Sequence, residues 1–191
     1  MIKRTFDLIF AMLFLFLALV PMTVIAMLII IDSKGSVIHK SKRVGKNNKI
    51  FNMYKFRTMK ITTPNLATHK LLKPQLYITR FGKILRKYSL DEIPQFFNVI
   101  LGNMSVVGPR PALFNQYDLI KLRTKKKIHF LMPGVTGWAQ INGRDNISIN
   151  KKVNLDEFYK KNQSIFFDFF IICLTLFNIS KKKIFHIKKI K

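Results

Sequence analysis

The chain begins with a hydrophobic run from Leu8 to Ile31 that contains no charged side chain. As a helix rising about 1.5 Å per residue, it would be roughly 36 Å long, enough to cross a hydrocarbon core of about 30 Å. Pro21 lies inside the run and has no N–H to donate to the Leu17 carbonyl, so we expect the helix to bend or break near Val20. The length predicts a membrane helix, and the proline predicts that it is not straight.

Basic residues flank this run on both sides. Lys3 and Arg4 precede it, and six basic residues follow soon after it: Lys34, Lys40, Lys42, Arg43, Lys46 and Lys49. The positive-inside rule then places both ends on the cytoplasmic side. We therefore favour a re-entrant hairpin in one leaflet, with the Thr23 hydroxyl near its break. A kinked helix that crosses once is the alternative, whereas a cleaved signal peptide fits poorly because the apolar region is too long.

After the run, the apolar and polar positions follow the pattern of a compact domain. Ser36–Ile38 and Lys49–Lys55 predict short strands, and the turn Gly45-Lys46-Asn47-Asn48 between them predicts a β-hairpin. Apolar residues recur at helical spacing in four later segments. These are Arg80–Arg86, Asp91–Ile100, Ala112–Lys126 and Leu155–Tyr159. Thr62–Gln75 predicts a loop, and Pro133–Arg144 a turn-rich stretch.

The last apolar segment, Ile165–Ile179, is interrupted only by Asp168, Thr175 and Asn178. It is short for a membrane span, so we expect an interfacial helix, with a buried core helix as the alternative. Taken together, the elements predict a helix-rich α/β (α+β) fold. It would comprise a re-entrant helix-break-helix anchor at 1–35, one small domain with a β-hairpin and interfacial amphipathic helices at 36–180, and a basic tail at 181–191.

Charge suggests an anionic partner. The 191 residues include 34 Lys and Arg against 9 Asp and Glu, a net charge of +25. Nucleic acid, anionic lipid headgroups and phosphorylated substrates all fit such a charge, and the anchor favours anionic lipids. Lys121–Lys127 and Lys181–Lys191 concentrate the charge, although each could simply be a solvated face.

The single Cys173 rules out an internal disulfide, and four scattered histidines argue against zinc: His39, His69, His129 and His186.

Because acids are so few, the adjacent pair Asp91-Glu92 is the first candidate for chemistry. One carboxylate can attack an electrophilic phosphorus while the other holds the divalent metal that neutralises phosphate oxygens. The alternative is structural: Ser89-x-x-Glu92 matches a capping box, in which Glu92 bonds back to the Ser89 backbone. The two interpretations are compatible, since a helix N-terminus also binds phosphate.

Two basic segments are candidates for phosphate binding. In Gly108-Pro109-Arg110-Pro111, each proline restricts the residue before it, so Arg110 lies in a stiff segment suited to a bidentate grip on phosphate. In Lys55-Phe56-Arg57-Thr58-Met59, alternation along a strand would place Lys55 and Arg57 on the same side. In both segments the alternative is a cation that simply faces water.

A further segment, Pro133–Arg144, contains the only tryptophan of the chain, Trp138, among glycines that allow close approach to a ligand. A base or a sugar could stack on this ring. Gln140, Asn142 and Arg144 could supply polar contacts. Alternatively, Trp138 is a core side chain beneath a turn.

These segments, in this order behind a proline-containing hydrophobic run, resemble the bacterial sugar transferase family. Within it they are most similar to the small monotopic phosphoglycosyl transferases. The resemblance extends over about Lys3 to Ile179 and is carried by three stretches: KFRTM, SLDEIPQFFNVILGNMSVVGPRP and PGVTGWAQINGR. The break of the family's re-entrant helix is often Ser-Pro, where this chain has Val20-Pro21.

The resemblance implies transfer of a sugar 1-phosphate from a UDP-sugar to polyprenol (undecaprenyl) phosphate, with release of UMP and a requirement for Mg²⁺. It makes Asp91 the covalent nucleophile and Glu92 the Mg²⁺ ligand, with Asp91 beside the metal. It also implies that Lys55, Arg86 and Arg110 stabilise phosphate. The reaction would be the first membrane step of glycoconjugate synthesis, for O-antigen, capsule, exopolysaccharide or glycoprotein. It would take place on the cytoplasmic face of the bacterial inner membrane.

The sequence leaves the sugar, the pathway and homo-oligomerisation open. The alternative function is a non-catalytic, membrane-tethered basic module that binds nucleic acid or acidic glycans. Because the chain has no recognisable DNA-reading helix and no ribonucleoprotein aromatic pair, we expect no nucleic-acid partner.

Overall fold

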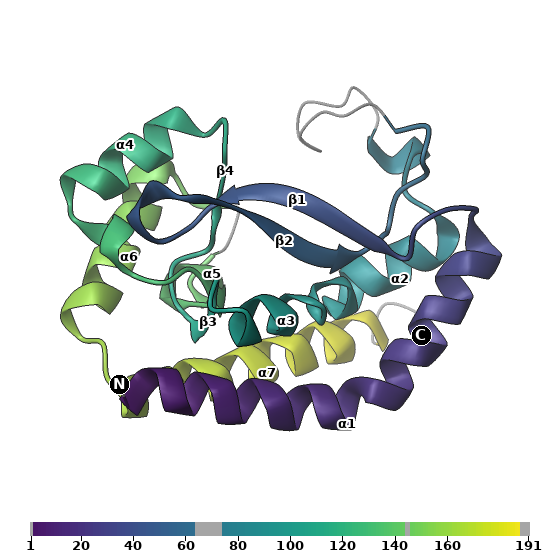
Figure 1. Ribbon diagram of the computed structural model, residues 1–191, viewed down its shortest axis with the longest axis horizontal. Coiled ribbons are helices and arrows are strands. Elements are labelled where there is room, and N and C mark those ends of the chain that lie inside the picture. The colour runs from purple at the N-terminus through teal and green to yellow at the C-terminus, as the bar shows by residue number, and fades with distance from the viewer. Residues whose placement is uncertain (1, 64–73, 144–145, 188–191) are drawn as a thin grey trace.

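The computed structural model describes residues 2–63, 74–143 and 146–187, with side chains through Phe177 (Figure 1). Most of the predicted loop Thr62–Gln75, all of the basic tail's side chains and Arg144 therefore lie outside the described residues. The helices are α1 (Ile2–Asp32), α2 (Arg80–Tyr88), α3 (Gln95–Ile100), α4 (Tyr117–Lys125), α5 (Trp138–Ile141), α6 (Ile149–Lys161) and α7 (Ile165–Ile187). The strands are β1 (Ile38–Val44), β2 (Ile50–Phe56), β3 (Ser105–Val107), β4 (Ala112–Leu113) and β5 (Gly134–Thr136).

Helix α1 continues through Pro21 without interruption. Figure 1 shows that it nevertheless changes direction, turning from its course beneath the domain to rise at one end. The helix is thus bent rather than broken, and Pro21 removes one backbone hydrogen bond from it while the flanking turns stay helical. Thr23 Oγ1 donates to the Val20 carbonyl at 2.7 Å, so the hydroxyl bonds to the backbone directly before Pro21. By length and composition, α1 is long enough to cross a membrane.

Both ends of α1 are attached to the same domain. Near its start, Arg4 Nη1 donates to the Val99 carbonyl at 2.6 Å. At its end, Asp32 Oδ2 accepts the Phe81 N–H at 3.0 Å. Between them one face is buried, through Ala11, Leu15, Ala18, Ile25 and Ile29. The opposite face exposes large apolar side chains, including Phe16 at 77% and Leu17 at 68%.

The predicted hairpin is present. Strands β1 and β2 pair antiparallel, with Lys55 opposite His39, and β4 adds to the other edge of β1. The first strand covers Ile38–Val44 rather than Ser36–Ile38. Its residues 39–43 are all polar, so they show no alternation of apolar and polar positions, and it is the pairing with β2 that makes them a strand.

Two of the predicted helices have different limits. The expected helix Asp91–Ile100 is divided into a 3₁₀ turn at Leu90–Glu92 and α3, which begins directly after Pro94. Proline suits the head of a helix, where its missing N–H has no intrahelical partner to lose. The expected helix Ala112–Lys126 begins only at Tyr117, because its first residues form β4 against β1. The predictions for Arg80–Arg86 and Leu155–Tyr159 are confirmed by α2 and α6.

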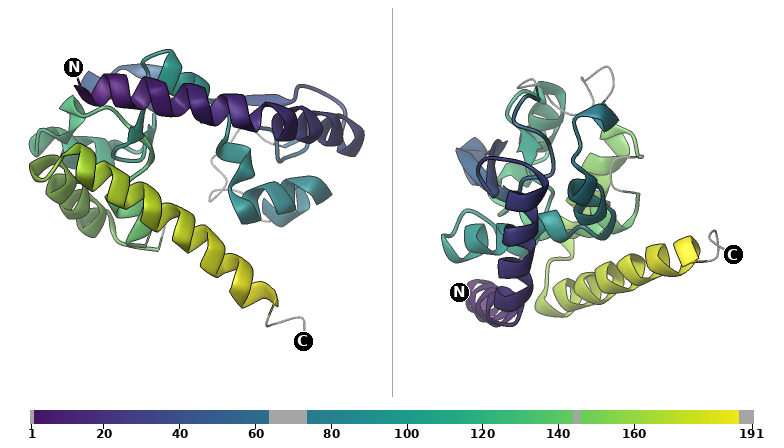
Figure 2. Two further views of the ribbon diagram at one scale, coloured as in Figure 1. Left: turned by 90° about the horizontal axis from the view of Figure 1, so that it is seen from below. Right: turned by 90° about the vertical axis from the view of Figure 1, so that its right-hand side faces the viewer.

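Helix α7 lies on the same side of the molecule as α1. Figure 2 shows both helices from below, crossing that side of the domain. The inner face of α7 buries Asp168, Ile171 and Ile172, whereas Phe166 is 89% exposed and Phe169 is 60% exposed. One face of the helix therefore belongs to the core, as the alternative expected, and the other is apolar and exposed. Its placement at a membrane interface stays a prediction.

The main core lies between α1 and the domain. Phe14 of α1 stacks on Phe96 of α3 with ring centroids 4.2 Å apart. Met104 and Val107, which flank or belong to β3, are fully buried in the same cluster, together with Ile171 of α7. This packing holds α3, and with it the preceding turn at Leu90–Glu92, against the anchor helix.

Candidate active site

Asp91 and Glu92 lie in the 3₁₀ turn between α2 and α3. Ser89 ends α2 in the left-handed conformation, with φ 57°, and turns the chain so that both carboxylates point inward; each residue is 9% exposed. Ser89 makes no side-chain cap hydrogen bond. The Glu92 carboxylate instead faces Lys55 and Arg110, so the capping-box interpretation is wrong.

Two segments that are distant from this turn in the sequence reach it. Lys55 Nζ of β2 lies 2.7 Å from Glu92 Oε1 and 3.9 Å from Asp91 Oδ2. Arg110 Nη2, from the Gly108–Pro111 segment, lies 3.1 Å from the same Glu92 oxygen. Burial lowers the pKa of Lys55, and the charge of Glu92 opposes that shift. The structure thus places two of the predicted phosphate-binding cations directly at the carboxylate pair.

Arg86 approaches the pair from the last turn of α2. Its Nε donates to Thr58 Oγ1 at 2.8 Å. Burial lowers the pKa of Arg86, and the nearby charge of Asp91 opposes the shift. With Lys55 and Arg110, this makes three cations around two carboxylates, a balance that favours a bound phosphate. Thr58 is buried at 6% exposure and orients Arg86, a role that the sequence reasoning missed although Thr58 stands in the KFRTM stretch.

Arg57 has a different position from the one its alternation with Lys55 suggests. Its guanidinium donates to the Ser33 carbonyl at 2.6 Å and to the Lys34 carbonyl at 2.8 Å, just after α1 ends. Its described contacts therefore join the anchor helix to the segment after β2. Contact of Arg57 with a substrate stays a prediction.

The Gly108–Pro111 segment is held in place by the Pro133–Arg144 stretch. The Gly108 N–H donates to the Thr136 carbonyl at 2.9 Å, and the Gly134 N–H to the Pro109 carbonyl at 3.0 Å. A Cβ on Gly134 or Gly137 would lie 2.1 Å from a backbone atom of Gly108. The close approach that these glycines allow is therefore one between two chain segments.

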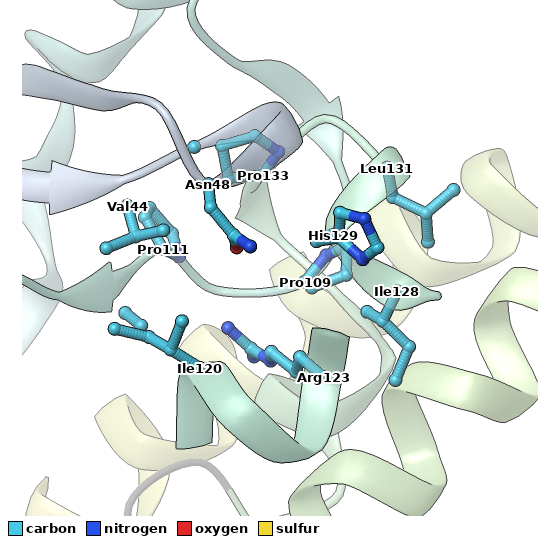
Figure 3. Close-up of a pocket in the computed structure, with 12 residues that line it drawn as sticks. Val44, Asn48, Pro109, Pro111, Ile120, Arg123, Ile128, His129, Leu131 and Pro133 are labelled. Atoms are coloured by element: carbon cyan, nitrogen blue, oxygen red, sulfur yellow. The ribbon is translucent and has the colours of Figure 1, made fainter. Parts of the chain in front are cut away.

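Arg123 supports the backbone of Arg110 from the opposite side. Its Nη1 donates to the Arg110 carbonyl at 2.8 Å, and its Nη2 donates to Asp156 Oδ2 at 2.6 Å. Figure 3 shows Arg123 beside a small cavity lined by Pro109, Pro111 and His129. Its volume of about 30 Å³ has room for roughly two waters, too little for a sugar nucleotide. Asp91 and Glu92 do not line this cavity.

The aromatic and amide residues of the Pro133–Arg144 stretch have partners of their own. Trp138 packs against Phe158 and Phe167, with ring centroids 5.8 and 5.1 Å away. Gln140 Nε2 donates to the Val135 carbonyl, and Asn142 Nδ2 to the Trp138 carbonyl, each at 2.8 Å. These contacts agree with the core alternative for Trp138. Contact of the three side chains with substrate stays a prediction.

His39 is a neighbour that the sequence reasoning did not find. It pairs with Lys55 across the hairpin, which brings its side chain close to that of Lys55. Burial lowers the pKa of His39, and so do the charges of Lys55, Arg43 and Arg86. Burial and the neighbouring cations thus both favour the neutral imidazole at the edge of this site. The hairpin register was the only signal that could have placed it there.

The donor set fits an oxygen-bound cation. Among the described residues, His, Cys, Asp and Glu form no group of three or more that could hold a metal ion. Asp91 and Glu92 nevertheless supply the one or two carboxylates with which proteins usually bind Mg²⁺, the other positions being taken by water and substrate phosphate. The pair therefore fits Mg²⁺, with water and a substrate phosphate as the remaining ligands.

Comparison with known proteins relates this arrangement to one family. The model of the bacterial sugar transferase family matches residues 1–182. The uncharacterized sugar transferase EpsL of Bacillus subtilis (strain 168) is 41% identical over 177 residues, which cover 92% of this chain and 85% of that protein.

Longer relatives carry more specific names. The UDP-glucose:undecaprenyl-phosphate glucose-1-phosphate transferase of Escherichia coli (strain K12) is 37% identical over 93% of this chain, which spans 40% of that protein. The UDP-N-acetylgalactosamine-undecaprenyl-phosphate N-acetylgalactosaminephosphotransferase of Aeromonas hydrophila is 35% identical over 92% of this chain and 43% of its own length.

Proposed function

This chain belongs to the bacterial sugar transferase family, and we propose that it transfers a sugar 1-phosphate from a UDP-sugar to polyprenol phosphate, releasing UMP. The observation that carries the proposal is the meeting of Asp91 and Glu92 with Lys55, Arg86 and Arg110, from three parts of the chain. Two relatives whose names specify this type of transfer differ in their sugar, glucose in one and N-acetylgalactosamine in the other. We therefore leave the sugar open.

In the first step, a carboxylate oxygen of Asp91 attacks the β-phosphorus of the UDP-sugar. The new Asp91–phosphorus bond forms as the bond from that phosphorus to the bridging oxygen breaks, and UMP leaves with the bond's electrons. Negative charge then builds up on the phosphate oxygens. Lys55, Arg86 and Arg110 already lie near the carboxylate pair, so they would stabilise this charge with little reorganisation.

In the second step, a phosphate oxygen of the polyprenol phosphate attacks the same phosphorus. The bond to Asp91 breaks, its carboxylate is restored, and the lipid leaves as a polyprenyl diphosphate sugar. Asp91 and Glu92 would hold Mg²⁺, which when bound supplies positive charge to the phosphate oxygens. The product would enter glycoconjugate synthesis.

We further propose that α1 enters and leaves one leaflet, with the domain on the cytoplasmic face. A straight helix across the membrane separates its ends by the thickness of the hydrocarbon core, about 30 Å. In this chain, Arg4 near one end and Asp32 at the other both bond to the same domain. The exposed apolar faces of α1 and α7 would then lie in lipid, with anionic headgroups next to the basic surface.

The decisive experiment is a UMP-release assay with polyprenol phosphate and a panel of UDP-sugars. We expect one or a few sugars to support release, and Asp91→Asn to abolish it while leaving membrane attachment unchanged. Asp118→Asn is the matched control, because Asp118 is exposed in the first turn of α4. Full activity of Asp91→Asn would refute the nucleophile assignment. Salt-sensitive binding without UMP release would favour the basic binding module.

A further inference from the structure

The outer edge of β2 is covered by a side chain. β2 is the edge strand of its sheet. The Tyr54 N–H donates to Asn98 Oδ1 at 2.9 Å, and Asn98 Nδ2 donates to the Asn52 carbonyl at 2.8 Å. Asn98 has no exposed surface. Its amide therefore satisfies a strand donor and a strand acceptor, as a neighbouring strand would.

These two hydrogen bonds join the same two segments as the Lys55–Glu92 ion pair. Tyr54 directly precedes Lys55 in β2, and Asn98 lies in α3, which follows the Asp91-Glu92 turn. Asn98 is itself fixed, because its backbone carbonyl accepts the N–H groups of Asn103 and Met104 at 2.9 and 3.1 Å. The buried Asn98 amide is thus a rigid link between β2 and the Asp91-Glu92 turn. The Lys55 side chain, which joins the same two segments, is a flexible one.

A lysine side chain needs such a link more than an arginine would. Lys55 reaches Glu92 through four rotatable bonds and presents a point charge, so the backbone position largely sets where the ammonium lies. A displacement of about 1 Å at a reacting centre can cost on the order of a hundredfold in rate. The two hydrogen bonds of Asn98 restrict sliding of β2 along α3, the motion that would carry Lys55 away from Glu92.

We propose that Asn98 is a positioning residue, which fixes β2 against the Asp91-Glu92 turn and so keeps Lys55 at the carboxylates. Its effect on the reaction rests on the proposed function, whereas its effect on Lys55 does not. Asn98→Asp is the most informative variant. Aspartate has the size of asparagine and keeps the oxygen that accepts from the Tyr54 N–H. It replaces the Nδ2 donor with an oxygen, which repels the Asn52 carbonyl oxygen.

The first test needs no substrate. The purified full-length protein is treated with acetic anhydride, and acetylation of each lysine is followed by peptide mass spectrometry. We expect Asn98→Asp and Asn98→Ala to raise the labelling rate of Lys55 on the order of tenfold, the factor for loss of ordinary hydrogen bonds. Lys126, which pairs with Glu157, is the internal reference and should not change.

Asn52→Ala is the matched control. The Asn52 side chain is exposed and only its backbone carbonyl accepts from Asn98, so this variant should label like the wild type. Unchanged labelling of Lys55 in both Asn98 variants would overturn the proposal. Equal increases at Lys55 and Lys126 would also overturn it, because they would show a general loss of stability.

The second readout is kinetic. Asn98→Asp should lower kcat for UMP release by more than tenfold, with KM for the UDP-sugar changed by less than about threefold, as for an interaction made in the transition state. A rise in KM at unchanged kcat would contradict this role. If the wild type releases no UMP from any UDP-sugar, the proposed function fails, and the labelling of Lys55 still decides the role of Asn98.

Discussion

Acidic side chains are scarce in this chain, nine against 34 lysines and arginines, and several of them are buried with specific partners. Asp7 accepts from Ser105 Oγ and Val106 N at 3.0 Å, and Asp168 accepts from Tyr159 at 2.7 Å. Scarcity and adjacency direct attention to two pairs, Asp91-Glu92 and Asp156-Glu157. Only the structure shows that Asp156 is instead paired with Arg123. The partners of Asp7 arise only when α1 packs against β3, and Asp168 of α7 meets Tyr159 of α6, contacts that no local pattern predicts.

At the residue scale, the burial of Lys55 predicts how the rate of UMP release depends on pH. Burial lowers its pKa, so the ammonium loses its proton at a lower pH than an ordinary lysine, whose value is about 10.4. The rate of UMP release should therefore decline as pH rises. The midpoint of this alkaline limb should lie below the ordinary lysine pKa. Lys55→Arg keeps its charge throughout this range, so the limb should disappear, with a lower plateau because the guanidinium differs in shape.

The measurement is kcat/KM for the UDP-sugar from about pH 7 to 11, with stability at each pH checked in parallel. Lys126→Arg is the control for a general effect of lysine replacement, since Lys126 pairs with Glu157 outside the site. An alkaline limb that persists unchanged in Lys55→Arg would assign the titration to another group.

At the element scale, local signals predict the hairpin but not every partner that completes the site. The turn at 45–48 indicates β1 and β2, whereas apolar spacing extends one helix across Asp91–Ile100, where the structure has a 3₁₀ turn before α3. Strands β3 and β5 pair in parallel, each three residues long. Strands this short show no readable alternation, and their partners are distant in the sequence. The contact between the Gly108–Pro111 segment and the Pro133–Arg144 stretch therefore could not be predicted from the sequence.

The same contact predicts that a side chain at position 137 lowers both stability and activity. A Cβ there would lie 2.1 Å from the Gly108 carbonyl oxygen, so Gly137→Ala must push the two segments apart and move Arg110. We expect a loss of more than about 1 kcal/mol in unfolding free energy, as for overpacking, and a fall in kcat of more than tenfold. Gly45→Ala is the control, because its Cβ would meet the Phe51 side chain at 3.0 Å and the Lys49 carbonyl oxygen at 3.3 Å, much less severe contacts. Denaturant titration and UMP release provide the two measurements, and equal effects at both glycines would contradict this account.

At the scale of the whole molecule, α1 and α7 put apolar surface on one side of a strongly basic domain. The hydrophobic run and its flanking charges predict membrane attachment. The attachment of both ends of α1 to one domain depends on long-range hydrogen bonds, which the run itself does not reveal.

Topology can be tested with single cysteines at the two ends of α1. Ile2→Cys and Ser36→Cys, each in a Cys173→Ser background, place thiols at exposed positions before and after the hydrophobic run. We expect a membrane-impermeant maleimide to label both from the cytoplasmic side of inverted vesicles and neither from the outside of intact spheroplasts. Labelling from opposite sides would establish a spanning helix.

The central claim is that Asp91 becomes covalently bonded to the transferred phosphate, and intact-peptide mass spectrometry after a single turnover tests it most directly. The protein is mixed with the UDP-sugar that supports UMP release, without polyprenol phosphate, and quenched. We predict one sugar phosphate on the peptide that contains Asp91, equimolar UMP, and loss of the adduct when polyprenol phosphate is added. Transfer that proceeds with no adduct on that peptide would contradict the account.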